Sequence, residues 1–152
     1  MLDSPNTAPT IKGMYIDGQW TPASRTFDDL NPSDNSLYAR IPDGSPEDVK
    51  RAIAAAKAAF PAWSGLAFHE RAHYLLKIAE VWDKRQGDFI NAAVQEGGGW
   101  FGKGVFEAGY VAEVFRSASA LCYQNIGEVL PSEHHKFMMA TRFPLGVVSV
   151  IS

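Results

Sequence analysis

The sequence predicts an α/β fold with an incomplete parallel sheet, and three observations support this prediction. The last stretch, residues 142–152, is rich in valine and isoleucine with almost no polar residue between them, which is typical of a parallel strand buried on both faces. Longer segments before it repeat apolar residues at helical spacing, and short β-prone pieces come first. A central parallel strand needs neighbours, so we expect this chain to be the front part of a larger protein.

The composition excludes several classes of protein. The chain has 152 residues, 46% of them hydrophobic and 20% charged, which suits one folded domain. Its net charge of −3 and its scattered lysines and arginines argue against nucleic-acid binding. No apolar run approaches the roughly 20 residues that span a bilayer, and the N-terminus lacks the pattern of a secretory signal. The single cysteine fits a reducing compartment, so we expect a cytoplasmic chain without membrane contact.

Residues 1–13 are rich in Pro, Ser, Asn and Thr and are expected to form a flexible arm. Two hairpins should follow it. The first is centred on Asp17-Gly18, a strong turn dipeptide, and the second runs from Phe27 to Ile41 around a turn at residues 31–35.

A first helix is predicted to begin at Ser45, which can cap the free N–H groups, with Pro46 in its first turn. Val49, Ile53 and Phe60 recur on one face, and we expect Pro61 to end the helix.

Two longer helices are predicted over residues 68–94 and 103–125, with the glycines at 97–99 as the linker between them. In the third helix we expect an inward-facing apolar set: Val105, Phe106, Ala112, Phe115, Leu121 and Cys122.

Residues 126–135 are interpreted as a connection, followed by an alternating segment over residues 136–143. This segment is predicted to be an edge strand that finds its partner on another subunit. Pro144 and Gly146 then set a bend before the final strand, residues 146–152.

One motif in the sequence could bind a metal. His69, Glu70 and His73 form H-E-x-x-H on a predicted helix, the spacing of a zinc hydrolase. We favour the simpler interpretation, a charged first helical turn, because the charged Arg71 lies between Glu70 and the second histidine and no third ligand can be identified. Cys122 has no base near it in sequence and is interpreted as an inert thiol.

Taken together, several short motifs resemble the N-terminal portion of the aldehyde dehydrogenase superfamily, in the same order along the chain. They are Tyr15–Trp20, Asn31-Pro32, Pro42–Val49, Ala59–Trp63, Glu70-Arg71 and Thr141–Val148. Residues 96–107 look more like the aryl-aldehyde branch, which includes benzaldehyde, salicylaldehyde and vanillin dehydrogenases. The resemblance implies oxidation of a small-molecule aldehyde to a carboxylic acid with NAD or NADP, by a thiolate and a carboxylate base that such proteins carry beyond the position of Ser152.

The resemblance also implies roles for parts of this chain. Residues 14–135 would belong to the cofactor-binding domain, residues 136–145 would form the oligomerisation strand of a homo-oligomeric dimer or tetramer, and residues 146–152 would begin the Rossmann-like sheet. Ile151 and Ser152 would contact the cofactor, and Tyr110 would lie near the substrate. Residues 1–152 alone should then be inactive. The alternative is a non-catalytic helical module that binds a partner or a second copy through its apolar faces.

Overall fold

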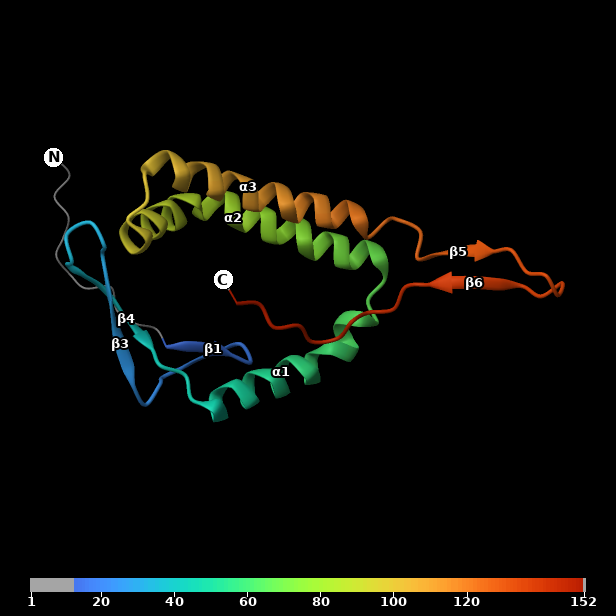
Figure 1. Ribbon diagram of the computed structural model, residues 1–152, viewed down its shortest axis with the longest axis horizontal. Coiled ribbons are helices and arrows are strands. Elements are labelled where there is room, and N and C mark those ends of the chain that lie inside the picture. The colour runs from blue at the N-terminus through green and yellow to red at the C-terminus, as the bar shows by residue number, and fades with distance from the viewer. Residues whose placement is uncertain (1–12, 152) are drawn as a thin grey trace.

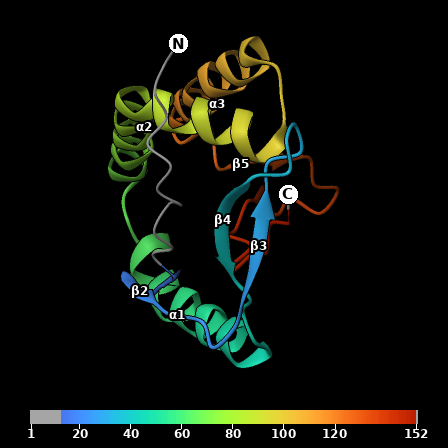
Figure 2. The ribbon, with the colours of Figure 1, turned by 90° about the vertical axis from the view of Figure 1, so that its left-hand side faces the viewer.

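The computed structural model describes residues 13–151, which fold into three helices and three separate hairpins (Figure 1). Except for Gly13, the arm predicted over residues 1–13 lies outside the described residues. The elements are β1 (Met14–Ile16), β2 (Gln19–Thr21), β3 (Thr26–Leu30), β4 (Leu37–Pro42), α1 (Pro46–Ser64), α2 (Phe68–Gly97), α3 (Phe101–Leu121), β5 (Gly127–Leu130) and β6 (Met138–Thr141). The α2–α3 pair forms one layer and α1 lies opposite it, with the β3–β4 hairpin spanning the two (Figure 2).

The structure confirms both N-terminal hairpins. Strands β1 and β2 pair antiparallel through a tight turn in which Asp17 and Gly18 have φ angles of 53° and 73°. Positive φ at both central residues gives a turn whose twist matches that of the strands. In the second hairpin the Asn35 N–H donates to the Asn31 carbonyl at 2.8 Å, and the Asn31 side-chain amide donates to Gln95 on α2 at 3.0 Å. The second turn is thereby attached to the helical layer.

Helix α1 begins as predicted but ends later. The Ser45 hydroxyl accepts a hydrogen bond from the Asp48 N–H, and the Asp48 carboxylate accepts one from the Ser45 N–H at 2.9 Å. The prediction that Pro61 ends this helix is wrong, because the helix continues to Ser64. Proline in the last turn removes a single hydrogen bond, and the Gly65 N–H then donates to the Pro61 carbonyl at 3.0 Å and closes the end.

The capping residues of α1 give the chain an acid-sensitive helix start. Hydrogen bonds from the Ser45 hydroxyl and N–H, with a further one from Arg51, lower the pKa of Asp48 to about 2. A depressed pKa stabilises the fold above the unfolded value of about 4, and this contribution should be lost as the pH falls from about 4 to 2. We expect Ser45→Ala to destabilise the chain by about 1 kcal/mol and to weaken this acid dependence. Urea unfolding at pH 7, 4 and 2.5 tests this, and an unchanged pH dependence would contradict it.

Helices α2 and α3 pack along each other through small residues. The buried positions on these helices are Ala72, Ala79, Gly104, Ala108, Ala112 and Ser119. Helix α3 ends at Leu121 instead of residue 125, and the prediction that Val105, Phe106 and Leu121 face inward is wrong, because all three are exposed. Small side chains let the two helices approach closely, and the larger apolar residues of α3 are left on faces that no other described element covers. Helix α2 has 30 residues, but no helix within residues 13–151 is apolar enough to cross a membrane.

The segment predicted as a connection contains a strand. Strand β5 pairs antiparallel with β6, with Val129 opposite Met139, and the hairpin projects away from the helices (Figure 1). The predicted strand at residues 136–143 is therefore real but shorter, and it pairs with β5 of the same chain. Its pairing with another subunit stays a prediction. Strand β5 has only four residues, too few to show an alternating pattern in the sequence.

The final strand predicted over residues 146–152 is not formed in the described residues. Residues 142–151 form no helix or strand, and they run between α1 and the α2–α3 pair (Figures 1 and 2). A parallel strand exists only when a neighbouring strand supplies hydrogen bonds, and no described strand lies alongside.

Candidate functional site

Tyr110, the predicted substrate residue, lies on the outer side of α3. Its ring stacks on that of Phe106, one helical turn earlier, with ring centroids 6.3 Å apart and an angle of 8° between the planes. The two residues are 63% and 72% exposed, so they form an open aromatic surface instead of a core contact. Such a surface can stack against an aromatic molecule.

The predicted cofactor residues, Ile151 and Ser152, are the last two residues of the sequence. Ile151 is 96% exposed at the end of the segment that runs between α1 and α2. Ser152 lies outside the described residues.

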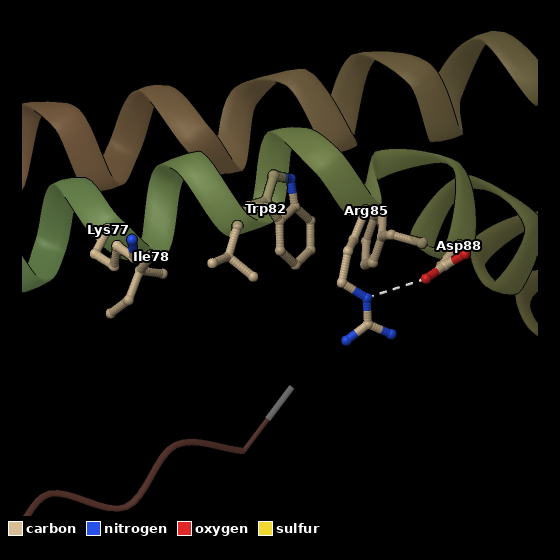
Figure 3. Close-up of a pocket in the computed structure, with 7 residues that line it drawn as sticks. Lys77, Ile78, Trp82, Arg85 and Asp88 are labelled. Carbon is tan, nitrogen blue, oxygen red and sulfur yellow. Dashed lines mark hydrogen bonds and ion pairs between the residues drawn. The ribbon is translucent and has the colours of Figure 1, made fainter.

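A groove on α2 was not predicted from the sequence. It has a volume of about 500 Å³ and faces the described end of the chain (Figure 3). Its lining consists of Lys77, Ile78, Val81, Trp82, Arg85, Asp88 and Phe89. The Arg85 guanidinium and the Asp88 carboxylate form an ion pair at 3.1 Å beside apolar side chains, as Figure 3 shows. The spacing of Ile78, Val81, Trp82 and Arg85 along one side of α2 is the sequence signal that could have indicated this second apolar face.

The H-E-x-x-H motif lies in the first turns of α2, where the sequence places it. The Glu70 carboxylate accepts a hydrogen bond from the Ala67 N–H at 2.8 Å and so closes the helix start. The His69 ring meets the Phe68 ring edge-on at 5.5 Å, and both His69 and His73 line a shallow hollow with Tyr123. Within residues 13–151 no group of three histidine, cysteine, aspartate or glutamate side chains is placed to hold a metal ion.

Cys122 follows the last residue of α3 and is half-buried. Its Sγ lies 3.6 Å from the Ala118 carbonyl oxygen, so the thiol can donate to the backbone of its own helix. This contact gives the thiol a local structural role.

Two carboxylates lie near a tyrosine where the β3–β4 hairpin meets α2. Burial raises the pKa of the Tyr38 hydroxyl, and the charges of Glu96 and Asp29 raise it further. One carboxylate oxygen of Asp29 is buried with no hydrogen-bond partner among the described residues. This cluster is another feature that sequence spacing does not indicate.

Comparison with known proteins identifies the family. The family model described as "Aldehyde dehydrogenase family" matches residues 20–152, most of the chain. The chain belongs to the aldehyde dehydrogenase family. The resemblance derived from the short motifs is therefore confirmed, as is the expectation of the N-terminal part of such a fold.

The relatives include aldehyde dehydrogenases that are named after aromatic aldehydes. The vanillin dehydrogenase of Pseudomonas fluorescens is 41% identical over 153 residues, covering 97% of this chain and 30% of that protein. The structure of a salicylaldehyde dehydrogenase from Pseudomonas putida G7, complexed with salicylaldehyde, matches with a TM-score of 0.81 and 29% identity, covering 86% of this chain and 28% of that one. Lactaldehyde dehydrogenase from Escherichia coli matches with a TM-score of 0.76 and 32% identity over 80% of this chain and 26% of its own. The chain thus spans about 30% of the length of these family members.

Proposed function

We propose that this chain forms the N-terminal part of an NAD(P)-dependent dehydrogenase that oxidises an aromatic aldehyde to a carboxylic acid. The observation that carries the proposal is the family match over residues 20–152, together with the identity to a vanillin dehydrogenase. When bound, NAD or NADP would accept the hydride from the aldehyde. The part of the family fold that this chain does not span would supply the nucleophile and the base, so residues 1–152 alone should be inactive.

Within such an enzyme, we assign Tyr110 to the substrate path. Its ring and the stacked ring of Phe106 present a flat apolar surface on α3 that fits the ring of an aromatic aldehyde. Ile151 and Ser152 are assigned to the cofactor, as the family resemblance implies. The β5–β6 hairpin, which projects from the helices, is assigned to contacts in a homo-oligomer.

Activity is tested with a chimera in which residues 1–152 replace the aligned part of the Pseudomonas fluorescens vanillin dehydrogenase. We expect the chimera to reduce NAD in the presence of vanillin and residues 1–152 alone to show no turnover. Steady NAD reduction by residues 1–152 alone, or a folded chimera without activity on any aldehyde, would contradict the proposal.

In the same chimera, Tyr110→Ala is expected to raise the KM for vanillin by about 2- to 10-fold, because an aromatic contact contributes about 0.5–1.5 kcal/mol. The KM for acetaldehyde, which has no ring to stack, should stay within about twofold. Tyr110→Phe keeps the ring and should behave like the parent enzyme. Steady-state kinetics with both aldehydes checks this, and an equal change in the two KM values would place Tyr110 away from the substrate.

The second candidate function is a non-catalytic module that associates through its apolar faces. The exposed apolar side chains of α1, including Val49 and Ile53, favour it, because these residues are about half exposed in the described part of the chain. Sedimentation of residues 1–152 distinguishes the candidates. A defined homo-oligomer would favour the module, provided the chimera is inactive.

A further inference from the structure

Two histidines lie on one side of α2 near its start. His69 and His73 are four residues apart on this helix, and β-carbons at that spacing on an α-helix lie about 5–6 Å from each other. Both side chains are exposed, and both line the same hollow. Two imidazoles at this spacing can bind one metal ion from the same side, at metal–nitrogen distances of about 2.0–2.1 Å for zinc.

The positive charge that argued against a metal site in the sequence is directed elsewhere. The Arg71 guanidinium donates a hydrogen bond to the Leu66 carbonyl, and Arg71 is half-buried. Arg71 lines a different hollow, together with Phe143, and does not line the one that His69 and His73 share. The guanidinium therefore does not occupy the space between the two imidazoles.

Neighbouring side chains favour a cation in this hollow and orient one of the two imidazoles. Glu70 also lines the hollow, so its negative charge attracts a cation, while one of its oxygens accepts the hydrogen bond from the Ala67 N–H at 2.8 Å. The His69 ring meets the Phe68 ring edge-on, and Phe68 in turn meets the Tyr123 ring edge-on at 5.2 Å. A ring held in this way loses less conformational freedom when it binds a ligand.

We propose that His69 and His73 bind one divalent ion of the nickel, copper and zinc group, and that the ion holds the first two turns of α2 together. Imidazole suits these metals, whereas magnesium and calcium prefer oxygen ligands. The protein supplies two ligands and water fills the other coordination positions, which agrees with the lack of a three-ligand group within residues 13–151. The site binds a metal without hydrolytic activity, because Glu70 closes the helix start. It is independent of the proposed dehydrogenase activity.

The test is isothermal titration calorimetry of untagged residues 1–152 with NiCl₂, and MgCl₂ serves as the salt whose metal should not bind. We expect one Ni²⁺ site per chain. His69→Gln and His73→Gln should each weaken binding by about tenfold or more, since loss of a residue that only supports a ligand already costs about 10–100-fold. His134→Gln is the matched control, because this histidine lies between β5 and β6, away from α2, and its removal should change the affinity by less than about twofold.

Urea unfolding with and without NiCl₂ shows whether the ion holds the helical turns together. The helix keeps the two histidines at the required spacing and the unfolded chain does not, so the metal should favour the folded state. With free Ni²⁺ at about 100 times its Kd, the ratio of folded to unfolded chain should rise by up to about 100-fold. The urea midpoint should rise in the parent and stay constant in His73→Gln. Without metal the two proteins should unfold at the same midpoint, because His73 is exposed.

Three results would overturn the proposal. Absence of Ni²⁺ binding, or equal binding of Mg²⁺, shows that the two imidazoles do not form a site for this group of metals. An affinity that His69→Gln and His73→Gln leave unchanged, or that His134→Gln lowers as much, places the metal elsewhere on the chain. Binding that leaves the urea midpoint of the parent unchanged shows that the ion does not hold the turns of α2 together. None of these results bears on dehydrogenase activity, which the chimera tests separately.

Discussion

Replacing Trp82 with alanine is expected to lower the free energy of unfolding of the chain by about 2–3 kcal/mol, below the range for a fully buried tryptophan because this ring is half-buried. The indole N–H donates to the Ala108 carbonyl at 2.7 Å and so joins α2 to α3. The ring also packs against Phe89 with centroids 4.9 Å apart. Replacement by alanine removes both contacts. The other buried residues between α2 and α3 are small, so they cannot make up for the lost stability.

Urea unfolding followed by circular dichroism at 222 nm measures this loss. Trp82→Phe keeps a ring but removes the donor, and should cost about 1 kcal/mol. Trp100→Ala is the matched control, because Trp100 is 79% exposed and its removal should change the stability by less than about 0.5 kcal/mol. Equal losses for the Trp82 and Trp100 variants would show that the indole does not hold the helices together.

Local signals in the sequence were sufficient for most elements. Asp17-Gly18 sets its turn through backbone conformations that depend on those two residues, and Ser45 caps its helix through atoms within the same turn. The long helices follow from periodicity over many residues. Each of these features is decided by neighbours in the chain, so spacing alone is enough to predict them.

Features that depend on distant contacts were predicted poorly. Strand β5 is defined by pairing with β6 across a loop, and four residues carry too little pattern to reveal it. Residues 146–151 have the composition of a buried strand, but a strand forms only beside another strand, and none is available among the described residues. The apolar residues of α3 were expected to face inward because composition indicates which side chains need cover, not whether a neighbour provides it.

The candidate site was predictable only in part for the same reason. The substrate role of Tyr110 was predicted from the resemblance, and its place on the third helix from the sequence pattern, whereas its stacking on Phe106 is visible only in the structure. The α2 groove could not be predicted, because the sequence does not show that the end of the chain lies opposite this face of the helix. The roles of Tyr110 and Ile151 remain proposals, because they depend on groups that this chain does not supply.

Gly98 is the second position where one substitution should have a large effect. It follows α2 with a φ of 59°, and a β-carbon built there would lie 2.6 Å from Cγ of Pro32. The turn that carries Pro32 cannot easily move away, because Asn31 is hydrogen-bonded to Gln95 near the end of the same helix. Gly98→Ala is therefore expected to destabilise the chain by about 2 kcal/mol or more, since left-handed backbone alone costs about 1–2 kcal/mol for a residue with a side chain.

Gly87→Ala provides a control of opposite sign. Gly87 lies inside α2, and a β-carbon there would meet nothing within 4 Å, so alanine should stabilise the helix by about 0.5–1 kcal/mol. The urea midpoints of the two variants should thus shift in opposite directions from the parent. Adding Pro32→Ala to Gly98→Ala should recover the part of the loss that comes from the steric contact and leave the part that comes from φ. If Gly98→Ala is neutral, the end of α2 and the turn of the β3–β4 hairpin do not pack as closely as this contact requires, and the hydrogen bond from Asn31 to Gln95 contributes more to the attachment of this hairpin than the contact at Gly98 does.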